Sequence, residues 1–310
     1  MKRRDFIINT SVASLGSVTL GLNARPPGKS LVTAGDMQDY LRSLHEVSEP
    51  SVDRIIIGDS GTKIQKVGTC WQPYFKTLRK AKELGINLMI VHEPTFYTHW
   101  DLDQESGLFN TVPLPAREKY LDAIQEKKRW IEENKMVIIR SHDVMDIVKG
   151  FGIPFALGKA LGYENKDIVR SKDYYNVYRV EPDKAWNIAR NIASRLMVLN
   201  QPGVAFYGDG ERMVSSVGLG TGCICDPMQY QELDHGLSIA IDDTVRTWTQ
   251  TTYAEDTGDP LVVINHGTSE EMGMRLLNQH LKENIPGIEF IHLNQGCSYR
   301  WITNDGSNMI

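Results

Sequence analysis

The chain has 310 residues, of which 41% are hydrophobic and 24% are charged, a composition typical of a globular protein with a core of its own. The formal net charge is −5 and the basic cluster lies at the extreme N-terminus, so we expect no nucleic-acid partner. The four cysteines contain no CxxC pair, which argues against a zinc ribbon and against a dense disulfide framework.

The N-terminus has the features of an export signal. The basic residues Lys2-Arg3-Arg4 precede a weakly apolar stretch, Phe6 to Leu22, that Ser, Thr and Asn interrupt. Paired arginines before such a stretch are typical of twin-arginine signals, and the interruptions disfavour a permanent transmembrane helix. We expect residues 1–28 to be a signal peptide and linker for the twin-arginine export machinery, and the mature protein to lie in the periplasm or cell envelope. A general secretion signal or a retained anchor is the alternative.

The first half of the chain alternates between strands and helices. Expected strands, read from short apolar runs, cover residues 52–59, 63–70, 86–91 and 136–141. Expected helices, read from amphipathic spacing, follow Gly35 and cover 72–85, 115–135 and 153–164. This repeated β-α-β order favours parallel strands joined by right-handed crossovers.

The second half continues the alternation. Strands are expected over residues 173–180, 214–225, 235–243, 261–265 and 288–294, and helices over 183–196 and 269–284. We predict an α/β protein with mixed sheets in two lobes around a central cleft. Residues 36–170 would form the first lobe and 171–310 a second segment, whose final β-α-β unit completes the first lobe.

Three of the apolar runs end at a histidine, and carboxylates follow each time. The three groups are His92-Glu93, His142-Asp143 with Asp146, and His266 with Glu270. Ligands gather at the carboxyl ends of strands in α/β sheets, and ionisable groups buried there are costly unless something neutralises them. We therefore expect a metal site in the cleft, and a bimetallic centre is its most specific form.

The spacing within two of these groups suits metal binding. If the last long helix begins early enough, His266 and Glu270 lie on one helical face, about 6 Å apart. If Thr268 or Ser269 caps that helix instead, the pair belongs to a capping box. His142 and Asp146 repeat the four-residue spacing. Imidazole and carboxylate donors together suit zinc, iron or manganese.

Several stretches resemble the Nif-three-like family of dinuclear metal proteins, also labelled type-two GTP cyclohydrolase I. They are KIQKVGTCWQPYFKTLRKAKELGINLMIVHEPTF, VIIRSHDVMD, VGLGTG, AIDD and NHGTSEEMGMRLLNQHL, which together span most of residues 50–295. The resemblance implies that His92, His266 and Glu270 are metal ligands and that Asp146 bridges the metals. It also implies an α/β fold with the metals in a cleft between lobes, and a homo-oligomer, commonly a hexameric ring.

One position departs from the family pattern. Where the family has a second histidine after His92, this chain has Glu93, a harder and anionic donor. Glu93 would either shift the metal preference toward manganese or iron, or weaken its site, and His99 or His142 could compensate. The Asp242-Asp243 pair matches a family position near the metals and is expected to orient a histidine.

The predicted metal site is compatible with two functions from different classes. The first is a metal-dependent hydrolase in which two ions, about 3.5–4 Å apart, activate a water against a small, unidentified substrate. His142 or Glu93 would shuttle the proton. Export would remove the protein from GTP, which argues against cyclohydrolase activity. The second is a non-catalytic metal-binding or metal-delivery protein of the cell envelope.

Overall fold

The computed structural model describes residues 33–101, 113–172, 174–220, 222, 235–243, 249–302 and 308–309. The expected signal peptide, residues 1–28, lies outside these ranges. Within them, no helix combines the length and the apolar character that crossing a membrane requires. The chain from Leu31 to Ile310 forms one compact unit.

The first sheet is mixed and has five strands in the described part of the chain. Their spatial order is β1 (Ile55–Ile57), β4 (Val137–Arg140), β3 (Leu88–Val91), β2 (Lys66–Cys70) and β11 (Glu289–His292). β1 runs antiparallel to β4, whereas the other neighbours are parallel. Every residue of β3 and β4 is buried, as expected of strands whose two faces are both covered.

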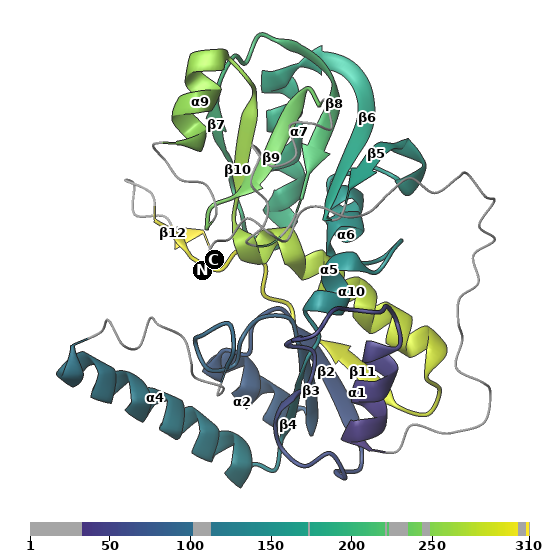
Figure 1. Ribbon diagram of the computed structural model, residues 1–310, viewed down its shortest axis with the longest axis vertical. Coiled ribbons are helices and arrows are strands. Elements are labelled where there is room, and N and C mark those ends of the chain that lie inside the picture. Colours follow the sequence, from purple (N-terminus) through teal and green to yellow (C-terminus); the bar gives the residue numbers. More distant parts are fainter. Residues whose placement is uncertain are drawn as a thin grey trace. The chain divides into compact units, whose positions relative to one another are not determined.

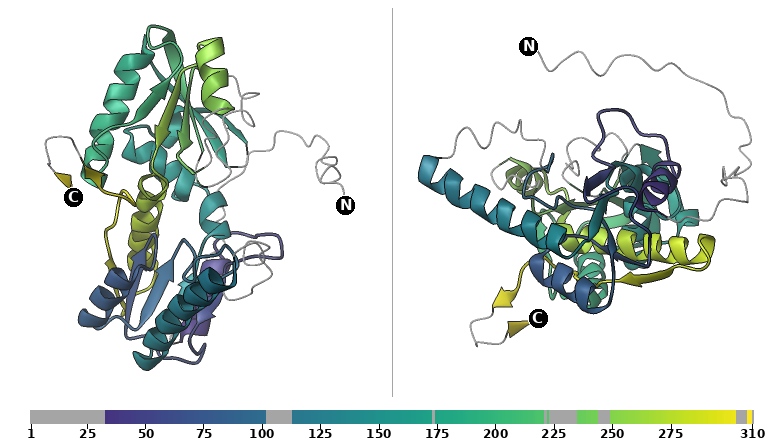
Figure 2. Two further views of the ribbon diagram at one scale, coloured as in Figure 1. Left: turned by 90° about the vertical axis from the view of Figure 1, so that its left-hand side faces the viewer. Right: turned by 90° about the horizontal axis from the view of Figure 1, so that it is seen from below.

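Helices cover both faces of this sheet (Figure 1). They are α1 (Ala34–Arg42), α2 (Phe75–Glu83), α4 (Leu114–Glu133) and α10 (His266–Asn284). Alternate residues of β3 belong to opposite faces, since Leu88 shares a hydrophobic cluster with α1 and α10, and Met89 shares one with α2 and α4. Figure 2 shows the N-terminal part of α4 extending beyond the sheet.

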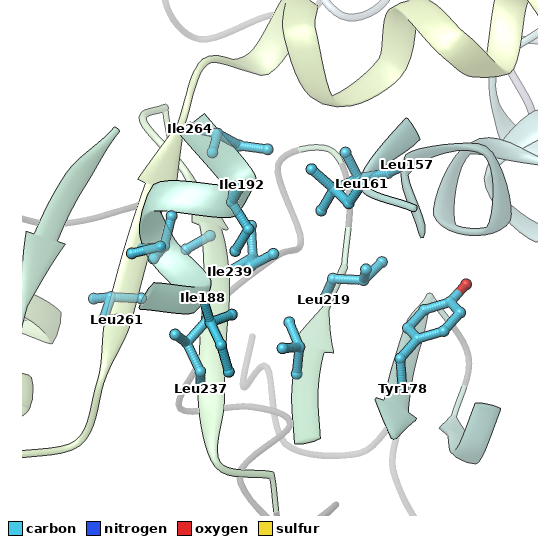
Figure 3. Packing of buried hydrophobic residues seen from close by; sticks show 14 of the residues in the cluster. Leu157, Leu161, Tyr178, Ile188, Ile192, Leu219, Leu237, Ile239, Leu261 and Ile264 are labelled. Carbon is cyan, nitrogen blue, oxygen red and sulfur yellow. The ribbon is translucent and has the colours of Figure 1, made fainter. Parts of the chain in front are cut away.

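The second sheet is also mixed. Its described strands lie in the order β5 (Ile168–Lys172), β6 (Tyr175–Lys184), β8 (Met213–Leu219), β9 (Leu237–Ile241), β10 (Leu261–Ile264) and β7 (Ala205–Tyr207). β8, β9 and β10 are parallel, and the remaining pairs are antiparallel. Its core includes Ile192 of α7 (Ala185–Leu196) and Ile239 of β9 (Figure 3).

The remaining described elements are short. They are α5 (Asp143–Ile147), α6 (Ile153–Ala160), α9 (Gln250–Thr257), the 3-10 turns η1 (Asn165–Asp167) and η2 (Met197–Leu199), and the strands β12 (Trp301–Ile302) and β13 (Asn308–Met309). With both sheets mixed and flanked by helices, the predicted α/β fold is confirmed.

Helix α10 connects the two sheets. It follows β10 of the second sheet and packs against α6 and against β2 and β11 of the first. The expected final β-α-β unit is therefore divided, with β10 in one sheet and β11 in the other. Of the two alternatives for the start of this helix, the earlier start is confirmed and the cap at Thr268 or Ser269 is wrong, because the side chain of Asn265 accepts the Thr268 N–H at 3.3 Å. Capping by Asn265 lets the helix begin at His266.

A buried lysine of α4 forms a hydrogen bond with the loop that follows β3. Lys127 is 2% exposed, and its Nζ donates a hydrogen bond of 2.7 Å to the carbonyl oxygen of Thr95. Burial lowers the pKa of Lys127 from 10.5 to about 8, although the carboxylate of Asp101 opposes the shift. The ammonium therefore carries its charge into the interior at neutral pH.

We predict that the free energy of unfolding depends on pH through Lys127. Between about pH 8 and 10.5 the unfolded lysine holds a proton that the folded one has lost, so stability rises with pH in that window, by up to about 3 kcal/mol. The test is denaturant unfolding across this range for the wild type and Lys127→Met, with Lys128→Met as the control on the exposed side of α4. A stability difference between wild type and Lys127→Met that is independent of pH would contradict the prediction.

Candidate metal centre

Strand register brings separate parts of the sequence to one edge of the first sheet. Cys70 pairs with Val91, and Val91 pairs with Arg140, so β2, β3 and β4 end together. The residues that follow these strands, among them Trp71 and His92, therefore leave the sheet side by side. α10 packs against β2 and brings its own first turn to the same edge.

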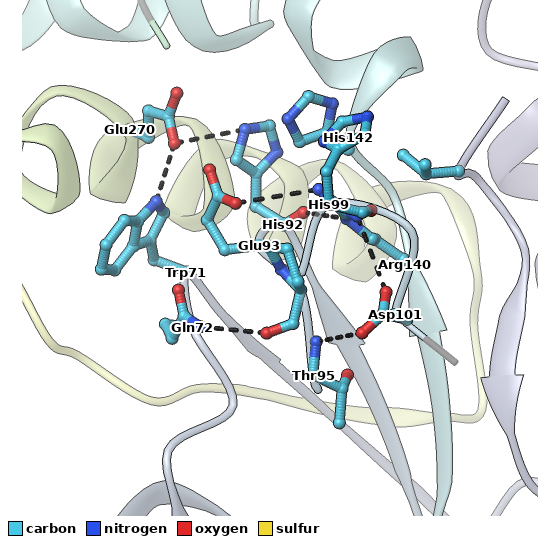
Figure 4. A network of polar contacts seen from close by, with 12 residues as sticks. Trp71, Gln72, His92, Glu93, Thr95, His99, Asp101, Arg140, His142 and Glu270 are labelled. Atoms are coloured by element: carbon cyan, nitrogen blue, oxygen red, sulfur yellow. Dashed lines mark hydrogen bonds and ion pairs between the residues drawn. The ribbon is translucent and has the colours of Figure 1, made fainter. Parts of the chain in front are cut away.

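The five side chains predicted as metal ligands meet here (Figure 4 shows three of them). Nε2 of His92 lies 3.3 Å from Oε2 of Glu270 and 3.6 Å from Oδ1 of Asp146. Nε2 of His266 lies 3.1 Å from the same Glu270 oxygen and 3.2 Å from Oε1 of Glu93. One carboxylate oxygen of Glu270 thus lies between two imidazole nitrogens.

Three groups among the described residues could hold a metal ion. They are His92, Asp146 and Glu270; Glu93, His266 and Glu270; and His92, Glu93 and His142, with the ligand atoms of each group within 4.8 Å of one another. The first two groups share Glu270, and the third adds His142. His99, considered as a substitute ligand, belongs to none of the three.

The donor atoms of this cluster are buried and under-satisfied. His92 and Glu270 are fully buried, and Asp146 and His266 are each 6% exposed. Nε2 of both histidines, Oδ1 of Asp146 and Oε1 of Glu270 make no hydrogen bond within the described part of the chain. Buried polar atoms are costly without partners, and a cation supplies one to each of these donors at once. The cluster therefore fits a bound metal ion.

The pKa shifts in the cluster show that each buried ionisable group depends on neighbouring groups of opposite charge. Burial, with a smaller contribution from the carboxylates of Glu270 and Glu93, raises the pKa of Asp146 to about 6, although His142 and His92 oppose the shift. Burial would lower the pKa of His92, but the carboxylate of Glu270 overcomes it and the pKa is raised to about 9. The pKa of Glu270 is lowered despite burial, because the two histidines stabilise its charge. Divalent cations would take over this role by displacing the imidazole protons.

Neighbouring groups fix the orientation of the histidines. Nδ1 of His266 lies 2.7 Å from Oδ2 of Asp243, and Asp242 accepts the backbone N–H of His266 at 3.1 Å. Nδ1 of His92 lies 3.2 Å from the carbonyl oxygen of Ser141. These contacts direct both Nε2 atoms toward the cluster. In metal sites, the second ring nitrogen of a ligating histidine is commonly bonded to a carboxylate or a backbone carbonyl in the same way. The contact of Asp243 agrees with the expected orienting role.

Trp71 is a site residue that the sequence patterns did not indicate. Its Nε1–H donates a hydrogen bond of 2.7 Å to Oε2 of Glu270, and its ring packs edge-on against His266 with centroids 5.4 Å apart. Gly267 makes this possible, since a Cβ there would lie 3.0 Å from the indole ring. The only local signal is its position directly after β2.

His142 lies on the more open side of the cluster. Its side chain is 17% exposed, its ring stacks on that of His92 with centroids 4.5 Å apart, and its Nδ1 lies 2.9 Å from Oδ1 of Asp143. The short helix α5 that positions it was not predicted. It forms because the buried carboxylate of Asp53 accepts the backbone N–H groups of His142, Asp143 and Val144.

Comparison with known proteins agrees with this fold. No curated protein matches the chain. Similar solved structures include Staphylococcus aureus hypothetical protein SA1388, with 16% identity, TM-score 0.69 and coverage of 87% of this chain and 99% of that one. A Bacillus cereus protein related to NIF3 has 12% identity, TM-score 0.70 and coverage of 88% and 100%. Reduced HcgD from Methanocaldococcus jannaschii has 17% identity, TM-score 0.63 and coverage of 84% and 98%.

These structures share the fold with this chain. The sequence model of the Duf34/NIF3 (NGG1p interacting factor 3) family matches residues 52–296, a range that includes every candidate metal ligand described above. The chain therefore belongs to the Duf34/NIF3 family.

Proposed function

We propose that this protein binds two divalent metal ions and uses them to hydrolyse a small substrate. The observation that carries the proposal is the position of Glu270, whose Oε2 lies 3.1 and 3.3 Å from the Nε2 atoms of His266 and His92. Each of these histidines has a further carboxylate beside it, Glu93 for His266 and Asp146 for His92. Two half-sites that share one carboxylate suit a pair of ions.

The residues divide between the two half-sites as follows. His92 and Asp146 would hold one ion, and Glu93 and His266 would hold the other. Glu270 would contact both, in place of the bridging Asp146 that the resemblance implies, because only Glu270 belongs to both groups. Donor sets of imidazole and carboxylate suit zinc, iron or manganese. When bound, such ions supply Lewis-acid charge and lower the pKa of water.

His142 is the better of the two candidates for moving a proton. Its Nδ1 lies 2.9 Å from Oδ1 of Asp143, so in the tautomer with the proton on Nδ1 this carboxylate would accept it and Nε2 would be free to accept a proton from the substrate or water. Both oxygens of Glu93 are engaged, since Oε1 lies 3.2 Å from His266 and Oε2 lies 3.7 Å from Nη2 of Arg140. Glu93 therefore suits metal binding better than proton transfer.

Metal storage or delivery in the cell envelope is the second candidate function. The complete burial of His92 and Glu270 favours it, because closed sites hold metals for structure or storage, whereas catalytic sites keep an open position. In either case we propose that the protein is exported by the twin-arginine machinery and assembles as a homo-oligomer. The N-terminal sequence supports the first of these proposals, and the family resemblance supports the second.

Metal analysis tests the centre directly. We expect the mature protein, purified without chelator, to carry about two transition-metal equivalents per chain. Asp146→Ala and His266→Ala should each lose metal, because each removes a donor from one half-site. His280→Ala is the matched control, since His280 contacts Tyr40 and Phe151 and belongs to no candidate metal group among the described residues. A wild-type protein without metal after reconstitution would refute the centre.

A hydrolysis screen separates the two candidate functions. With metal loaded, we expect turnover on one class among phosphoester, amide and peptide substrates. His142→Gln should then lower kcat by about 100-fold or more while metal content is retained, the usual effect of removing a general base. His45→Gln, on an exposed loop, is the control. A fully loaded wild-type protein that turns over none of these substrates would favour storage or delivery.

A further inference from the structure

Arg140 is a buried cation beside the metal centre. It is the last residue of β4 and is 0% exposed. Its Nε donates a hydrogen bond of 2.9 Å to the carbonyl oxygen of His92, and its Nη1 donates one to the carbonyl oxygen of His99. A guanidinium is costly to bury unless carboxylates neutralise it, so its acidic neighbours identify what it does.

Two carboxylates face this guanidinium (Figure 4). Oδ2 of Asp101 lies 3.6 Å from Nη1, and Oε2 of Glu93 lies 3.7 Å from Nη2. Asp101 is itself held in place, since its other oxygen accepts the backbone N–H groups of Thr95 and Phe96. Nη2 makes no hydrogen bond within the described part of the chain, so Glu93 is the group at which it is directed.

The two oxygens of Glu93 therefore face different partners. Oε1 faces the candidate centre, 3.2 Å from Nε2 of His266, whereas Oε2 faces Arg140. Because only Oε1 faces the candidate centre, Glu93 offers a metal ion one oxygen and not two. Arg140 also offsets the additional negative charge that Glu93 brings to its half-site.

We propose that Arg140 is a positioning residue that restricts Glu93 to ligation through one oxygen and thereby sets the metal preference of the centre. The inference rests on the metal centre proposed above. Single-oxygen ligation favours the low coordination number of zinc. A glutamate free to offer both oxygens favours manganese, which takes more oxygen ligands. Arg140 thus opposes the shift toward manganese that Glu93 would cause by itself.

The test is competitive loading of metal-free protein in chelator-buffered mixtures of Zn²⁺ and Mn²⁺, with bound metals measured by elemental analysis after desalting. Arg140→Gln should raise the bound Mn²⁺:Zn²⁺ ratio by about ten-fold, the lower end of what loss of an outer partner does to metal affinity. In a Glu93→Gln background the same substitution should change nothing, because an amide cannot offer two carboxylate oxygens. A purely structural role of Arg140 would not depend on Glu93 in this way.

Two further variants keep the test decisive. Arg140→Lys retains the buried charge but lacks the planar fork, so it should fold even if Arg140→Gln does not, and it should show a smaller shift in the same direction. Arg212→Gln, which removes an arginine paired with Asp259 at the protein surface beside the second sheet, should leave the ratio unchanged. An unchanged ratio in Arg140→Lys and Arg140→Gln, or a shift that persists with Glu93→Gln, would overturn the inference. A wild type that binds neither metal would instead refute the metal centre itself.

Discussion

The buried carboxylate of Glu270 is the constraint on which the rest of the site depends. It is 0% exposed, and its Oε2 accepts the indole N–H of Trp71 while lying within 3.3 Å of two imidazole nitrogens. An isolated charge in that position would cost several kcal/mol, so the surroundings must supply positive charge and donors. The convergence of His92 and His266 on this oxygen satisfies that demand from two different segments of the chain.

The first turns of α10 also connect the two sheets. Glu270 faces the other candidate metal ligands, and the next residue, Glu271, lies 2.8 Å from Nε2 of His292 in β11 and accepts the backbone N–H of Gln295. The helix starts at His266 because Asn265 caps it. Asn265 therefore places His266 in the first turn of α10, one helical turn before Glu270, while the neighbouring Glu271 contacts β11.

Charge alternates outward from the centre. The carboxylates of the cluster meet the imidazoles, Glu93 meets Arg140, and Arg140 meets Asp101, which also influences Lys127. Each member is nearly or fully buried, so each depends on the next for neutralisation. This succession explains how a site rich in carboxylates is accommodated next to a Val- and Ile-rich sheet.

The sequence by itself determined the α/β fold and the candidate ligands, because both are local patterns. Apolar runs identify buried strands, polar residues at their ends identify the functional edge, and the four-residue spacing of His266 and Glu270 identifies one helical face. Only the tertiary structure decided the roles of Trp71 and Arg140 and the division of the last β-α-β unit between two sheets. These depend on strand register and on contacts such as that between Trp71 and Glu270, 199 residues apart, which no local periodicity encodes.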